Sequence, residues 1–303
     1  RIPDPGTPAV SFFWSSLECV FTELFPAVKD DAARLGIWKT CLDDMRRAGQ
    51  TILEIRPQQG TGIMDRYVRV VEFGEDGLPL LDTTGWEPFL EAAREAGMED
   101  AIFRYGFVNR AWLPRSFPQM TADRKEEVES RILGQLIATL QKKGFKRIFF
   151  YLIDELDPSP EKIAAVCAKM DGLKAKFPVL EFAGSGFAGT PVDAMKTLAR
   201  RLTWIAPYWS VYSLIEQLGT GEIPLLPGTI TGTQASGDFR AGYNHARRTV
   251  WQCWKAGLNG YQVYGYRTFY PNHGYSCVFP GPDGPVPSQT LWGLIDGRED
   301  FLL

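Results

Sequence analysis

Residues 147–155 read Arg-Ile-Phe-Phe-Tyr-Leu-Ile-Asp-Glu, an almost unbroken apolar run that ends in two adjacent carboxylates. The turn sequence Leu-Asp-Pro-Ser-Pro follows at 156–160, and a helical pattern begins there. Such a run is typical of a strand buried on both faces, as in a parallel sheet. Because α/β folds form their active sites at the carboxyl ends of such strands, Asp154 and Glu155 are the first candidate site residues. A structural interpretation is also open, in which Asp154 caps the turn and Glu155 is solvated.

Segments with strand character alternate with amphipathic helical patterns along the whole chain. The predicted strands lie at 9–13, 51–55, 101–107, 147–155, 179–183, 202–206, 225–233 and 260–264. The predicted helices lie at 29–48, 86–97, 123–143, 160–176, 191–201, 213–218, 241–256 and 288–303.

Eight such units in a chain of 303 residues predict a (β/α)8 TIM barrel, an α/β fold in which the acid pair closes strand four. Prolines in and next to the segment of the seventh predicted strand, 225–233, indicate that this strand is irregular. The alternative is a doubly wound open sheet, which would need a glycine-rich phosphate loop after its first strand, and the sequence has none. We expect residues 1–8 to be a linker and 9–303 to form one barrel domain, with a small hairpin inserted near 58–84.

Composition narrows the classes of partner. The formal net charge is -3 with both signs interspersed, so no nucleic-acid partner is expected. No apolar run is long enough to span a membrane. Five widely spaced cysteines without a Cys-x-x-Cys pair, and only two histidines, argue against a metal site, and no cofactor motif is present. The chain begins at Arg1 without a leader, which suits a mature form or fragment of a secreted or periplasmic protein, with a cytoplasmic protein as the alternative.

The acid pair suggests glycosidic bond cleavage. In that reaction one carboxylic acid protonates the leaving oxygen, while a carboxylate stabilises the positive charge that develops at the anomeric carbon. Burial keeps the first group protonated, and hydrogen bonds keep the second ionised. A conventional glycosidase would need a further carboxylate, for which Glu54 and Glu181 are candidates. Their positions within strands suit a buried salt bridge equally well.

Other predicted strand ends supply groups that a glycan substrate would need, namely hydroxyls and guanidiniums for its OH groups and aromatic rings for its C–H face. The predicted substrate-binding residues are Arg56, Arg104, Tyr105, Tyr208, Trp209, Tyr264, Tyr266 and Arg267. For each of them a structural role is the alternative. Trp251 and Trp254 lie on a helical pattern and are expected in the core.

Three segments in order resemble glycoside hydrolase family 123 and its related domains. They are the strand and acid pair at 143–155, the helix at 247–260 that carries Arg-x-x-x-Trp-x-x-Trp-Lys-x-Gly-x-x-Gly, and the closing helix from 287 to 302. The resemblance implies a (β/α)8 barrel, often preceded by a β-sandwich, and a single catalytic domain. It further implies a β-N-acetylgalactosaminidase-like enzyme in which the acetamido oxygen of the substrate is the nucleophile. Asp154 would then orient the acetamido group, and Glu155 would be the general acid and then the base.

The sequence also departs from that family. Gln289 and Ile295 stand where the closing helix of the family has arginine, and residues 229–235 replace a tryptophan-rich strand seven. Three functions therefore stay open. They are a retaining, substrate-assisted glycosidase acting on a β-linked N-acetylhexosamine, a conventional glycosidase acting on a glycan without the acetamido group, and a carbohydrate-binding barrel without catalysis. The sugar, its linkage and the oligomeric state do not follow from the sequence.

Overall fold

The structure is a computed structural model. It describes residues 9–12, 17, 20–55, 66–104, 122–155, 158–207, 212–235, 242–263, 277–282 and 284–300.

The strands, in chain order, are β1 (Ala9–Phe12), β2 (Ile52–Ile55), β3 (Arg69–Phe73), β4 (Pro79–Asp82), β5 (Asp100–Arg104), β6 (Ile148–Asp154), β7 (Leu180–Gly186), β8 (Leu202–Pro207), β9 (Ile230–Thr231), β10 (Gln234–Ala235), β11 (Gly260–Val263), β12 (Val278–Gly281) and β13 (Gly284–Pro287). The helices are η1 (Val20–Leu24), α2 (Asp31–Arg47), α4 (Glu87–Glu95), α6 (Ala122–Lys142), α7 (Pro160–Lys176), α8 (Val192–Ala199), α9 (Tyr212–Thr220), α10 (Gly242–Lys255) and α11 (Gln289–Glu299).

The helices begin and end where the local sequence predicts. The Asp30 side chain caps α2 by accepting a hydrogen bond from the backbone N–H of Ala33 at 2.8 Å. Pro160 opens α7, where its missing N–H costs no hydrogen bond. Gly144, with a φ of +81°, follows the end of α6 and takes the left-handed conformation that commonly terminates a helix.

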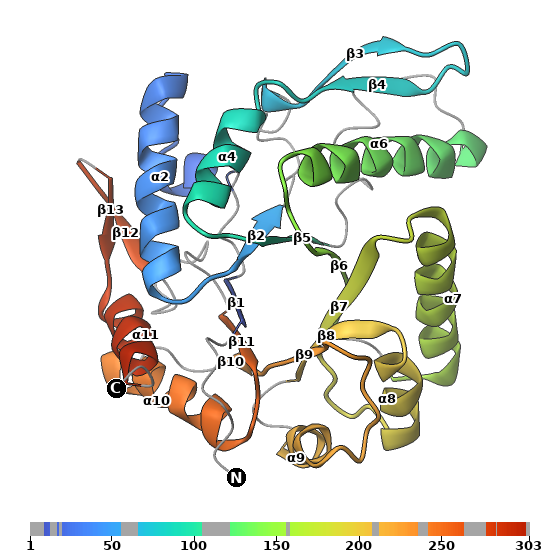
Figure 1. The fold of residues 1–303 in the computed structure, drawn as a ribbon, viewed down its shortest axis with the longest axis vertical. Helices are drawn as coiled ribbons and strands as arrows, with labels where there is room; N and C mark the ends of the chain where they lie inside the picture. The colour runs from blue at the N-terminus through green and yellow to red at the C-terminus, as the bar shows by residue number, and fades with distance from the viewer. Residues whose placement is uncertain are drawn as a thin grey trace.

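Parallel strands form a ring at the centre of the molecule, and the helices surround it (Figure 1). Six strands pair in the order β2-β5-β6-β7-β8-β9, and three pair in the order β1-β11-β10. The segment 230–235 joins the two sheets, because β9 pairs with β8 and β10 pairs with β11. On the other side of the ring, β1 lies beside β2. The predicted (β/α)8 barrel is therefore confirmed, and strand seven is irregular because it is split into two short pieces.

The molecule has two hydrophobic cores, one inside the ring of strands and one outside it. The inner core fills the barrel with Ile52, Ile102, Phe149, Tyr151, Ala183, Trp204, Ala206 and Ile230. The outer core lies between the strands and the helices and includes Trp38, Leu136, Phe150, Met170 and Leu294. Successive side chains of a strand point to opposite faces, so each barrel strand supplies residues to both cores. This explains why β6 reads as an unbroken apolar run.

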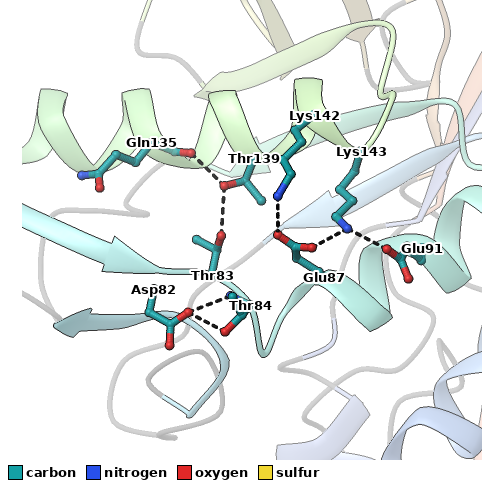
Figure 2. Close-up of polar contacts among 9 residues, drawn as sticks. All are labelled: Asp82, Thr83, Thr84, Glu87, Glu91, Gln135, Thr139, Lys142 and Lys143. Carbon is teal, nitrogen blue, oxygen red and sulfur yellow. Dashed lines mark hydrogen bonds and ion pairs between the residues drawn. The ribbon is translucent and has the colours of Figure 1, made fainter.

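An antiparallel hairpin of β3 and β4 lies beyond α6 in Figure 1. Polar contacts join the end of this hairpin and α4 to α6 (Figure 2). Thr83 Oγ1 lies 3.2 Å from Thr139 Oγ1, and Lys143 Nζ lies 2.5 Å from Glu87 and 2.6 Å from Glu91. Thr139 is buried, whereas the lysine and the two glutamates are partly exposed, so their ion pairs contribute little to stability.

The expectation that Trp251 belongs to the core is wrong. Its side chain is 43% exposed, and its indole N–H donates to Asp300 Oδ2 at 2.9 Å. The buried face of α10 contains Val250 and Cys253, and the position of Trp251 between them in sequence turns it about 100° away from that face. The described cysteines, Cys41, Cys167, Cys253 and Cys277, have buried side chains. In the described part of the chain, no helix is long and apolar enough to cross a bilayer.

Candidate active site

Four neighbouring strands bring polar side chains to the carboxyl end of the barrel. On β2 and β5, Ile52 and Ile102 belong to the inner core, and Glu54 and Arg104 lie two residues further along on the same face. On β6 and β7 the residues are Tyr151, Asp154 and Ser185. We call these five side chains, Glu54, Arg104, Tyr151, Asp154 and Ser185, the carboxyl-end cluster.

A β-bulge decides which way Asp154 points. Strict alternation would put Tyr151 and Ile153 on the inner face and Asp154 on the outer one. The pairing with β7 shifts at Leu152, because Tyr151 and Ile153 pair with consecutive residues of β7. This extra residue reverses the alternation, so Ile153 packs in the outer core and Asp154 contacts Tyr151. The bulge thereby delivers the carboxylate to the inside of the barrel.

Both carboxylate oxygens of Asp154 accept a hydrogen bond. Arg104 Nη2 donates to Oδ2 at 3.3 Å, and the Tyr151 hydroxyl donates to Oδ1 at 3.0 Å. The side chain of Asp154 is nevertheless 45% exposed. Each carboxylate oxygen can accept more than one hydrogen bond, so Asp154 has acceptor capacity for a ligand.

Tyr151 is a buried donor in this cluster. Burial, followed by the negative charge of Asp154, raises the pKa of Tyr151 well above its ordinary value, so the hydroxyl keeps its proton. That single proton goes to Asp154, and the hydroxyl of Ser185 is also within hydrogen-bond reach of the Tyr151 oxygen. Ser185 must therefore be the donor in the second contact. The chain of hydroxyls therefore runs from Ser185 through Tyr151 and ends on the Asp154 carboxylate.

Arg104 lies between two carboxylates. Its Nη1 atom is 3.9 Å from Glu54 Oε1, and its guanidinium lies 5.7 Å from the centre of the Tyr151 ring. Burial would lower the pKa of Arg104, but the nearby carboxylates of Glu54 and Asp154 raise it. The arginine is therefore a fixed cation. Glu54 is only 1% exposed and lies against this cation, whereas Asp154 is the exposed partner.

Glu155 ends the strand in an unusual backbone conformation. Its φ is +52°, a left-handed conformation that costs a non-glycine residue about 1–2 kcal/mol. Its backbone N–H donates to the carbonyl of Ser185 at 3.4 Å. The facing residue, Gly186, has a φ of +92°, and a Cβ there would lie 3.1 Å from the backbone nitrogen of Glu155. The turn therefore requires glycine at 186, and Glu155 leaves the strand with an exposed side chain.

The opposite, amino end of the barrel contains a second arginine between two carboxylates. Arg147 Nη2 lies 2.6 Å from Glu181 Oε2, and the Arg147 backbone N–H donates to Asp100 Oδ1 at 3.1 Å. Glu181 pairs in register with Phe149, one inward-facing position before Tyr151. Glu181 is thus held in a salt bridge, at a strand position nearer the amino end of the barrel than the acid pair. Of the two candidates for a further carboxylate, only Glu54 lies in the carboxyl-end cluster.

Arg104 and the acid pair are the predicted site residues that the structure describes. The other predicted substrate-binding residues lie outside the described residues, and they stay predictions: Arg56, Tyr105, Tyr208, Trp209, Tyr264, Tyr266 and Arg267. Sequence reasoning missed Tyr151 and Ser185, because an undisturbed strand would not place Tyr151 beside Asp154. Within the described ranges, no group of His, Cys, Asp and Glu side chains could hold a metal ion.

Comparisons with known proteins support the fold. No family model matches the sequence, and no curated protein does, so the resemblance to family 123 stays a prediction. The chain is similar in structure to the catalytic domain of a family 30 xylanase C from Talaromyces cellulolyticus, with 13% identity over 95% of this chain and 73% of that one, and a TM-score of 0.52. It is also similar to a family 5 mannosidase from Rhizomucor miehei, with 10% identity over 100% of this chain and 95% of that one, and a TM-score of 0.50. These likenesses establish the barrel fold.

Proposed function

We propose that this protein is a retaining glycoside hydrolase that cleaves a β-linked N-acetylhexosamine by substrate-assisted catalysis. The observation that carries the proposal is the carboxylate of Asp154, which is exposed at the carboxyl end of β6 and held by two donors. The two similar barrels described above are both named as enzymes that act on glycans, which supports the same reaction class. The order of residues Asp154 and Glu155 agrees with the roles that the resemblance to family 123 implies.

In this mechanism Asp154 accepts a hydrogen bond from the acetamido N–H of the substrate. The acetamido oxygen then attacks the anomeric carbon, and Glu155 protonates the leaving oxygen as the glycosidic bond breaks. Asp154 stabilises the positive charge that develops on the acetamido group. In the second half, the Glu155 carboxylate removes a proton from the water that attacks the same carbon. Both displacements invert that carbon, so the configuration is retained.

The position of the remaining acids supports this mechanism over a conventional one. A conventional nucleophile must touch the anomeric carbon. Glu54 is 1% exposed and faces Arg104, while Glu181 is bonded to Arg147 at the other end of the barrel. Asp154 is the exposed carboxylate of the cluster, and its neighbour Glu155 is exposed as well. Adjacent acids suit a reaction in which the substrate supplies the nucleophile.

The test is hydrolysis of aryl β-N-acetylgalactosaminide and aryl β-N-acetylglucosaminide by the wild type, Asp154→Asn and Glu155→Gln. We expect each variant to lose about 10²–10⁴-fold in kcat/KM, because each lacks one group of the reaction. Glu181→Gln is the matched control and should keep wild-type activity. Equal activity in all four proteins would overturn the proposal. Cleavage of an aryl glycoside without the acetamido group would instead favour a conventional glycosidase, and glycan binding without turnover would favour a carbohydrate-binding barrel.

A further inference from the structure

The carboxyl-end cluster contains a pair of side chains that the proposed reaction does not use. Glu54 on β2 and Arg104 on β5 are almost fully withdrawn from solvent, with side chains 1% and 12% exposed. A buried charge pair of this kind contributes little net stability, because removing two charges from water costs about as much as their attraction returns. A stabilising role alone therefore does not account for the pair.

The orientation of the pair indicates what it acts on. Arg104 directs Nη2 to Asp154 Oδ2 at 3.3 Å, while its Nη1 faces Glu54 Oε1 at 3.9 Å. The three strands are direct neighbours in the sheet, in the order β2-β5-β6. The guanidinium thus lies between Glu54, which is at ion-pair distance, and Asp154, to which it donates a hydrogen bond. Arg104 donates to Oδ2 and Tyr151 donates to Oδ1, so the two contacts together restrict the position of the Asp154 carboxylate.

Charge gives the pair a second effect. An arginine beside Asp154 orients the carboxylate but also compensates its negative charge. Glu54 offsets the arginine, so Glu54, Arg104 and Asp154 together carry a net charge of −1. Tyr151 and Ser185, which extend the hydrogen bonds of Asp154, are neutral, and Glu155 directly follows Asp154 in the sequence. A net negative charge is what stabilises the cationic intermediate of the proposed reaction.

We infer that Glu54 and Arg104 are positioning residues for Asp154. Arg104 orients the Asp154 carboxylate, and Glu54 offsets the positive charge of Arg104 so that the group of three keeps a net negative charge. This inference rests on the proposed function for its catalytic consequence. It assigns Arg104 a role beyond the substrate contact that its strand end predicts. It also gives Glu54, the remaining candidate for a further carboxylate, a role without direct contact to the reacting carbon.

Four variants separate orientation from charge: Arg104→Lys, Arg104→Gln, Glu54→Gln and the double variant Glu54→Gln/Arg104→Gln. Arg104→Lys keeps the charge but loses the planar fork, and we expect kcat to fall about 10–100-fold with KM within about threefold, as for a misplaced catalytic group. Glu54→Gln and Arg104→Gln change the net charge around Asp154 in opposite directions. The acid limb of the pH profile of kcat/KM should therefore move to lower pH in Glu54→Gln and to higher pH in Arg104→Gln.

The double variant removes both buried charges and restores the net charge of −1, so it keeps the test valid even where Arg104→Gln alone fails to fold. We expect its acid limb to return to the wild-type position while kcat stays low, because the orienting hydrogen bond from Arg104 to Asp154 is missing. Glu181→Gln is again the control, since it removes a carboxylate from the matching pair at the amino end. It should leave both the rate and the profile unchanged.

Crystal structures of the wild type, Arg104→Lys and the double variant provide a measurement that does not depend on activity. We expect Asp154 to occupy one rotamer in the wild type and a different or divided position in both variants. If Asp154 moves but no protein hydrolyses an N-acetylhexosaminide, the positioning role holds and the proposed substrate is wrong. If hydrolysis occurs while Asp154 stays in place, kcat is unchanged and the acid limbs do not separate, the inference is overturned.

Discussion

Each end of the barrel contains an arginine near two carboxylates, but the two groups differ in how exposed their acids are. At the carboxyl end, Arg104 lies between Glu54 and Asp154, and at the amino end Arg147 lies between Asp100 and Glu181. At the carboxyl end one acid is buried and the other is 45% exposed, so the cluster presents a carboxylate to a ligand. At the amino end Glu181 is 24% exposed and engaged by two nitrogens of Arg147. The presence of these charges therefore does not distinguish a candidate active site from a structural salt bridge, whereas the exposure of the acids does.

Loss of either arginine should have the largest effect on stability, and the two losses should differ. Arg104→Met leaves Glu54 buried without its cation, which we expect to cost about 3–5 kcal/mol. Arg147→Met leaves the more accessible Glu181, which water can solvate, so the cost should be about 1–2 kcal/mol. Urea unfolding at pH 7 measures both free energies. Equal losses would mean that the two ends do not differ in the way the exposures indicate.

Asp100 makes the amino end sensitive to pH. Burial raises the pKa of Asp100 from 3.8 to about 6. Since the folded state binds the proton more tightly than the unfolded state, this group favours folding at low pH and loses that contribution as pH rises from about 4 to about 6. Asp100→Asn keeps an oxygen for the Arg147 N–H but carries no charge. We expect it to raise the free energy of unfolding at pH 8 by at most about 3 kcal/mol, at about 1.4 kcal/mol per pH unit.

Thermal or urea unfolding of the wild type and Asp100→Asn between pH 4 and pH 8 tests this sign. The difference between the two proteins should be small at pH 4 and grow until it levels off above pH 6. A variant that is less stable than the wild type at pH 8 would show that the ionised Asp100 contributes a favourable interaction with Arg147 instead.

The smallest expected effect concerns the turn at the carboxyl end. Gly186 and Gly189 both have positive φ values, +92° and +71°, so replacement of either by alanine should cost about 1 kcal/mol through backbone strain. A Cβ at Gly186 also meets the backbone of Glu155 at 3.1 Å, whereas a Cβ at Gly189 has open space. We expect Gly186→Ala to lower kcat about tenfold by displacing Glu155, and Gly189→Ala to leave it unchanged. Equal kcat values in the two variants would show that the turn at Glu155 does not affect catalysis.

The sequence predicts the barrel well because its signals are local. Most strands are short apolar segments, and helix ends carry local signals, such as the Asp30 cap of α2 and Pro160 at the start of α7. The alternation of the two patterns then leaves few arrangements of parallel strands. The exception among the helices, the exposed Trp251, arises because a stretch with apolar residues on several sides does not reveal which side meets α11.

The candidate site is only partly predictable in this way. The acid pair is visible in the sequence, because Asp154 and Glu155 end an apolar run. The partners of Asp154 are not visible, because Arg104 is fifty residues distant and Tyr151 reaches Asp154 only through the bulge at Leu152. A bulge depends on the pairing of two strands, and it leaves no signal in the period of one strand alone.

The apolar run at 147–155 thus carries its strand character and its terminal acids in local sequence, where period and composition suffice. Its neighbours in the barrel decide the rest. The register with β7 turns Asp154 inward, a hydrogen bond from Arg104 holds its carboxylate, and Gly186 makes room for the turn at Glu155. These are contacts between segments far apart in the chain, so they form only when the strands have closed into the ring.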